Sequence, residues 1–147
     1  MVHRNALTVC SLFLLLGQAV ADDSQRHQQV GGMDIYLGVL PAQITQAQHP
    51  NMHGATDGDE HRYHLLVALF DSKSDERITD ARVKATVAQL GMEGKTKALA
   101  LMGGELLSYG NYFAMHKPDY YRIGVEIQRA GSGGKSVAKF VFQRPRD

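Results

Sequence analysis

Short segments in which apolar and polar residues alternate follow one another along most of the chain, and turn-forming residues separate them. The segment 120–128 has the clearest pattern, because its apolar side chains all have odd numbers: Tyr121, Ile123, Val125 and Ile127. Successive side chains of a β-strand point to opposite faces, so this alternation is typical of a strand with one buried and one solvated face. A chain built from such segments is constrained to an antiparallel β-sheet fold.

Six further segments complete the expected set of strands: 33–40, 62–70, 80–90, 96–102, 109–116 and 136–143. The segment 80–90 also has Val83, Val87 and Leu90 at helical spacing, but the strands expected on both sides of it favour a strand. Seven or eight short antiparallel strands at a spacing of about ten residues predict one all-β domain, an immunoglobulin-like β-sandwich. We expect this domain to cover residues 33–147.

The first 21 residues have the pattern of a secretory signal peptide. Arg4 supplies a positive charge, an apolar run covers 6–16, and Ala19-Val20-Ala21 provides the small residues that signal peptidase accepts. The apolar run is too short to span a bilayer, which takes about 20 residues. We therefore expect a periplasmic or secreted protein with no membrane span in the mature chain. The polar segment 22–32 is expected to be a flexible lead-in.

Cleavage would also change the chemistry available to the chain. Cys10, the only cysteine, would leave with the signal peptide, so the mature protein would have no thiol and no disulfide. That excludes thiol catalysis and cysteine-ligated metal sites. The remaining 126 residues carry 15 basic and 15 acidic side chains without a basic run. This balance argues against nucleic acid as a partner.

Potential metal ligands gather in one part of the sequence. The segment 49–64 contains one methionine, Met52, and four histidines: His49, His53, His61 and His64. Imidazole suits copper, zinc, nickel and iron, whereas a thioether is soft and favours Cu(I). The segment therefore predicts a metal site. Copper is the metal we expect, and zinc or nickel is the alternative if histidine alone supplies the ligands.

A second pair of potential ligands, Met115 and His116, lies at the end of a predicted strand. Neighbouring residues on a strand face opposite sides, so at most one of the two can meet a site directly. Each feature also has an ordinary interpretation, since Met115 suits a hydrophobic core and a histidine-rich loop can simply be solvated. Met92 and Met102 lie near strand ends, where a site at the rim of the sandwich could collect them.

Two parts of the chain resemble known β-sandwich domains. In the first, Phe70-Asp71 ends a strand and Ala81-Arg82-Val83 begins the next one. In the second, Gly110-Asn111-Tyr112 precedes Asp119-Tyr120-Tyr121. The first part resembles a sandwich signature. The second is similar to the C-terminal half of YtkA-like and FixH-like domains, which are small immunoglobulin-like sandwiches, several of them linked to copper handling. The start of the domain, Gly32-Met33-Asp34, is also similar to periplasmic iron-transport-associated proteins that hold copper through Met and His.

We expect from these observations an exported copper-binding protein that acts as a chaperone, buffer or delivery module. Its expected partners are a metal ion and a membrane transporter or an oxidase-assembly protein. The alternative is an accessory module that docks on a cell-envelope complex and leaves the histidine-rich loop solvated. We expect no enzymatic activity, because no acid/base pair has a defined partner and no serine lies in a nucleophile-elbow motif.

Overall fold

The structure is a computed structural model of the chain, and it describes residues 25–44, 61–103 and 107–146. The predicted signal peptide and the potential ligands His49, Met52 and His53 lie outside the described residues. Within these ranges, no helix is long and apolar enough to cross a membrane.

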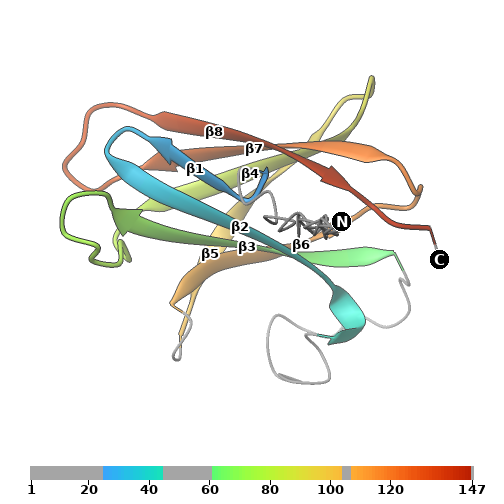
Figure 1. Cartoon of the computed structure of the whole chain (residues 1–147), viewed down its shortest axis with the longest axis horizontal. Coiled ribbons are helices and arrows are strands. Elements are labelled where there is room, and N and C mark those ends of the chain that lie inside the picture. The colour runs from blue at the N-terminus through green and yellow to red at the C-terminus, as the bar shows by residue number, and fades with distance from the viewer. Residues whose placement is uncertain (1–24, 45–60, 104–106, 147) are drawn as a thin grey trace, which may run out of the picture.

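The described residues form eight strands (Figure 1). They are β1 (His27–Val30), β2 (Met33–Pro41), β3 (Arg62–Asp71), β4 (Arg82–Gln89), β5 (Lys95–Met102), β6 (Ser108–Ala114), β7 (Tyr120–Gln128) and β8 (Ser136–Gln143). All neighbouring strands pair antiparallel, in the order β1-β2-β3-β6-β5-β4-β7-β8. The expected strand over 80–90 is confirmed as β4.

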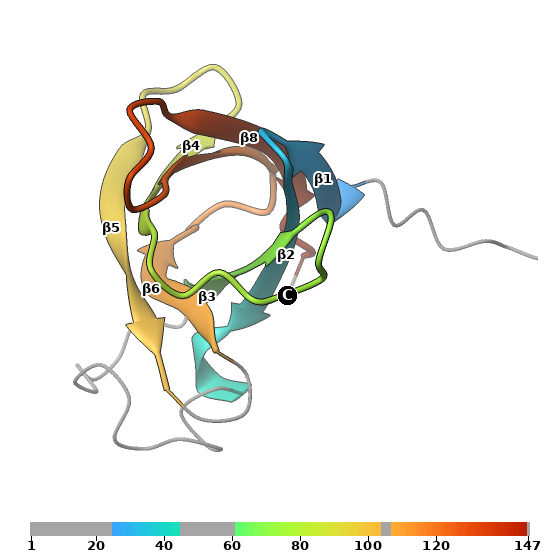
Figure 2. The ribbon, with the colours of Figure 1, turned by 90° about the vertical axis from the view of Figure 1, so that its left-hand side faces the viewer.

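One strand, β5, belongs to both layers of the fold. Residues 95–99 pair with β4, and residues 100–102 pair with β6. The sheet thus bends at β5, and its two halves face each other around the core (Figure 2). The layer β2-β3-β6-β5 has the order of strands A, B, E and D of an immunoglobulin domain, and β4-β7-β8 has the order of C, F and G. The predicted immunoglobulin-like β-sandwich is confirmed.

The expectation of a flexible lead-in over 22–32 is wrong for part of that segment. His27–Val30 forms β1, which pairs with β2 through a turn at Gly31 and Gly32. Both glycines have positive φ, 59° and 74°, a conformation that side-chain-bearing residues rarely adopt. The segment carries little apolar periodicity, so only its pairing with β2 makes it a strand.

The core lies between the two layers and takes one face of each strand. In β3 these inward residues are Tyr63, Leu65, Val67 and Leu69, and in β7 they are Tyr121, Ile123, Val125 and Ile127. The odd-numbered side chains of 120–128 are therefore buried together, as their alternation predicts. At the open side of the fold, β1 approaches β8: the Gln28 side chain donates to the Lys139 carbonyl, and the Lys139 N–H donates to Gln28 Oε1 at 3.1 Å.

Candidate functional site

His64 lies on the face of β3 that points away from the core. Its neighbours Tyr63 and Leu65 are core residues, so strand alternation turns the His64 side chain to the outer face of the layer. A residue on an outer face is normally solvated, yet only 2% of His64 is exposed. The burial of an outward-facing histidine singles out this position.

Met102 lies beside His64, although the two residues belong to different strands. Both side chains flank Gly110 of β6, which pairs with Leu66 of β3 and with Ala100 of β5. A Cβ atom at residue 110 would lie 2.8 Å from His64 Nε2 and 2.8 Å from Met102 Sδ. The nitrogen and the sulfur are therefore at most twice that distance apart. Like His64, Met102 is buried and lies outside the core cluster.

Tyr112 forms a wall of the same cluster. It pairs with His64 across β6 and β3, and the two rings stack with their centroids 4.5 Å apart. The Arg62 guanidinium lies over the Tyr112 ring, 4.8 Å from its centroid. The stacking fixes the plane of the imidazole, and the glycine at 110 allows Nε2 to lie close to the backbone of β6. We name His64, Met102, Gly110 and Tyr112 the outer-face cluster.

The donor atoms of the outer-face cluster fit a soft metal ion. An imidazole nitrogen and a thioether sulfur, both shielded from water, are ligands that suit Cu(I). A Cβ at Gly110 would clash with both atoms, so the glycine allows them to lie together against the backbone of β6. Two protein ligands are a partial set, and among the described residues no three His, Cys, Asp or Glu side chains come together as a metal site. The sequence predicts only that Met102 lies near the rim. Alternation along residues 100–102 shows which face a side chain takes, but it does not show that His64 of another strand is its neighbour.

His61 and His116 form a separate cluster. Their rings meet edge to face at a centroid distance of 5.9 Å. Arg144, of which 2% is exposed, donates from Nη2 to His61 Nδ1 at 2.8 Å and also lies over the ring of Tyr63, a core residue. Because a guanidinium can only donate, Nδ1 accepts and the proton of the neutral ring is on Nε2. The nitrogen that could bind a metal is therefore occupied by Arg144.

Met115 lies in the core. It is fully buried, belongs to the same cluster as Phe113, and its N–H donates to the His61 carbonyl at 2.8 Å. Its side chain is on the opposite face of the layer from His64. Of the sequence-predicted ligands that the structure describes, the outer-face cluster contains His64 alone, while His61 and His116 meet each other and Met115 packs in the core.

Comparisons with known proteins place the fold. No protein-family model and no curated protein matches the chain. A solved structure of a DUF4426 family protein from Pseudomonas aeruginosa PAO1 is similar with a TM-score of 0.64 at 15% identity, over 83% of this chain and 95% of that one. FetP of uropathogenic Escherichia coli strain F11, as isolated, has a TM-score of 0.64 at 13% identity, over 82% and 93%.

A copper-bound variant of the same FetP has a TM-score of 0.60 at 14% identity, over 81% of this chain and 93% of that one. At these identities the likeness establishes the fold. This likeness supports, at the level of the fold, the resemblance to exported sandwich domains that the sequence predicts. None of these three structures is described as YtkA-like or FixH-like.

Proposed function

We propose that the chain is an exported, non-enzymatic copper-binding protein that holds Cu(I) at the outer-face cluster. The ligands would be Nε2 of His64 and Sδ of Met102, which approach each other beside Gly110. The single observation that carries the proposal is the approach of these two buried donor atoms to one point at residue 110. The copper-bound state of a FetP variant with a similar fold supports the choice of metal.

The protein groups in this site would have defined tasks. Stacking on Tyr112 holds the imidazole of His64 in one plane, which prepares its nitrogen for binding. The methionine side chain is flexible, so Met102 can adjust its sulfur to the ion or release it. Bound copper would supply no catalytic step here. Its transfer would proceed by exchange of ligands with a transporter or an oxidase-assembly protein.

Three sequence-predicted ligands, His49, Met52 and His53, stay predictions for completing the site. They precede β3 in the segment that enters the strand carrying His64. Zinc or nickel would be the expected metal if histidines alone supplied the ligands, whereas the thioether of Met102 favours Cu(I).

Competition with a Cu(I) chelator tests the site. The mature domain, without an affinity tag, is titrated as the parent and as the His64→Ala and Met102→Leu variants. Loss of a ligand is expected to raise the dissociation constant for Cu(I) by about tenfold or more. His116→Ala and Met115→Leu are matched controls, because they remove the same chemical groups away from the outer-face cluster. Unchanged affinity in both site variants would refute the assignment.

The alternative function is docking on a cell-envelope complex without a metal. It is favoured if the parent binds copper no more tightly than a peptide with the scrambled sequence of 49–64. Recovery of one partner from an envelope extract by the parent and by the His64→Ala variant alike would then support the docking module.

A further inference from the structure

Among the described strands, the change of layer by β5 leaves part of β6 without a paired strand on one side. β5 pairs with β6 only as far as Gly110, and its residues 95–99 turn to β4 instead. Residues 111–114 of β6 therefore border a gap between the two layers. Two side chains bridge this gap: Asn111 Nδ2 donates to the Ala98 carbonyl at 2.7 Å, and Lys97 Nζ donates to the Tyr112 carbonyl at 2.5 Å.

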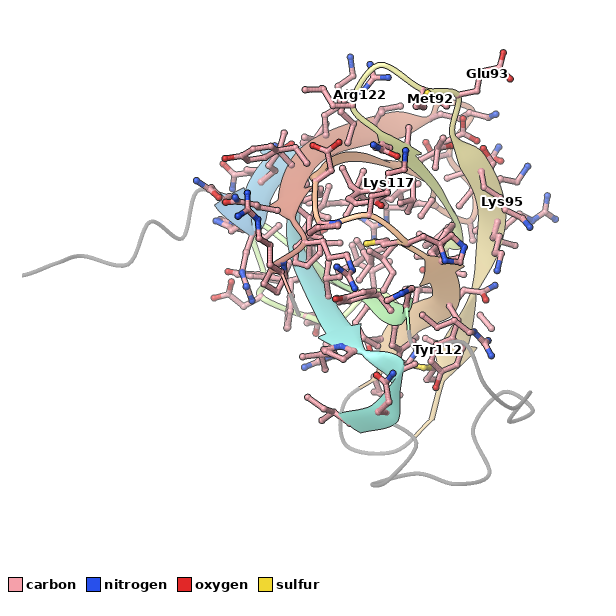
Figure 3. The ribbon with its side chains drawn as sticks, turned by 90° about the vertical axis from the view of Figure 1, so that its right-hand side faces the viewer. Met92, Glu93, Lys95, Tyr112, Lys117 and Arg122 are labelled. Atoms are coloured by element: carbon pink, nitrogen blue, oxygen red, sulfur yellow. The ribbon has the colours of Figure 1, made fainter. Side chains whose placement is uncertain are left out.

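A pocket of about 270 Å³ lies at this gap. Three cationic side chains line it, namely Arg62 from β3 and Lys95 and Lys97 from β5. The buried residues Val87 and Phe113 form its floor, and the Lys97 ammonium lies over the Phe113 ring at 5.2 Å from its centroid. None of the described residues that line the pocket is a carboxylate. Figure 3 labels Lys95 and Tyr112, which approach the pocket from β5 and β6.

The cations of this pocket repel one another. The pKa of Lys97 is lowered, first because burial disfavours the charged ammonium and then because the charges of Lys95 and Arg62 lie close by. None of the ion pairs given by the described residues involves Lys95 or Lys97. An anion in the pocket would relieve this repulsion.

We propose that this pocket binds a small polycarboxylate anion, with its carboxylates on Arg62, Lys95 and Lys97. Three separated cations match several carboxylates better than one compact inorganic anion. The volume lies just below the range of about 300–1,000 Å³ typical of pockets for drug-sized ligands, which restricts the occupant to a small molecule. The proposal does not depend on copper, since none of these side chains is a proposed metal ligand.

Calorimetric titration of the metal-free mature protein with citrate tests the proposal, with sulfate at equal ionic strength as the reference anion. Citrate is expected to bind one site and sulfate much more weakly. A Lys95→Gln/Lys97→Gln variant is expected to weaken citrate binding by about tenfold or more, because charged hydrogen bonds are lost. Lys84→Gln/Lys139→Gln is the matched control, because it removes the same charge from two exposed lysines outside the pocket.

The single variant Lys95→Gln guards against a folding defect, since Lys97 also bridges the gap to Tyr112. It is expected to weaken citrate binding while the thermal unfolding midpoint stays close to that of the parent. Absence of citrate binding, equal binding of sulfate, or an equal loss in the control variant would overturn the proposal. Binding of a hexaglutamate peptide in place of citrate would also overturn it and would assign the pocket to an acidic protein partner.

Discussion

His64 Nε2 and Met102 Sδ lie at the same distance, 2.8 Å, from the point that a Cβ atom would occupy at residue 110. The two side chains come from β3 and β5, and β6 lies between these strands. Glycine at 110 allows both atoms to lie this close to the backbone of β6. The geometry explains how a methionine and a histidine that are 38 positions apart in the sequence can serve one ion.

The space at residue 110 gives the first prediction. Gly110→Ala should displace the His64 ring and the Met102 thioether, since real Cβ contacts are not made at 2.8 Å. We expect the dissociation constant for Cu(I) to rise by about tenfold or more in a chelator competition. Gly124→Ala in β7 is the matched control, because its added Cβ meets nothing within 4 Å. Equal copper affinity in the parent and Gly110→Ala would contradict a site at this position.

Substitution of Met115 should lower the stability of the fold without changing its affinity for copper. Met115→Ala removes a fully buried core side chain and is expected to lower the free energy of unfolding by about 2–5 kcal/mol. Its copper affinity should match that of the parent at a temperature where the variant is folded. Met92→Ala, at a position that is 62% exposed, should change the stability by less than about 0.5 kcal/mol. Urea denaturation measures both values, and a weaker copper complex in Met115→Ala would argue against our assignment of Met115 to the core.

Asp71 should make the fold sensitive to acid. The N–H of Lys73 lowers the pKa of this carboxyl most, followed by the side chain of Arg129 and the N–H of Ser74. A carboxyl with a lowered pKa in the folded state stabilises the fold above its unfolded pKa. This stabilisation disappears as the pH falls through the folded pKa.

The Asp71→Asn variant tests this dependence. It should have a lower urea midpoint than the parent at pH 7, and the difference should shrink as the pH is lowered towards 2. Glu93→Gln, in the exposed turn between β4 and β5, makes the same change of charge as a control. A difference between parent and Asp71→Asn that is constant over this pH range would show that the charge of Asp71 has no part in it.

The side chain of Gln28 links β1 to β8 through two hydrogen bonds to the main chain of Lys139. Gln28→Ala should lower the free energy of unfolding by about 0.5–1.5 kcal/mol, because the bonds are exposed. The variant should also expose the edges of β1 and β8, and exposed strand edges favour association between chains. Urea denaturation and size-exclusion chromatography measure the two effects, with Gln143→Ala on β8 as the control. A Gln28→Ala variant that is as stable and as monomeric as its control would contradict this role.

The sequence by itself determined the strands and their buried faces. Alternation is a local property, so the odd parity of Tyr121 to Ile127 and of Tyr63 to Leu69 could be followed along each segment without knowledge of its partners. The same parity already directs His64 away from the core and Met115 into the core beside Phe113. The absence of cysteine after residue 10 likewise restricts any metal site to His, Met and carboxylate ligands.

The tertiary structure decided which of these side chains meet. β1 exists because β2 offers a partner to a polar segment, and His61 is held by Arg144, which is 83 positions away. The contact between His64 and Met102 depends on β5 leaving β4 and pairing with β6 in the register that sets Met102 opposite Ser108. Strand order and register are fixed by the packing of the whole core, and a shift of one residue would turn Met102 to the other face, so no single segment can determine that contact.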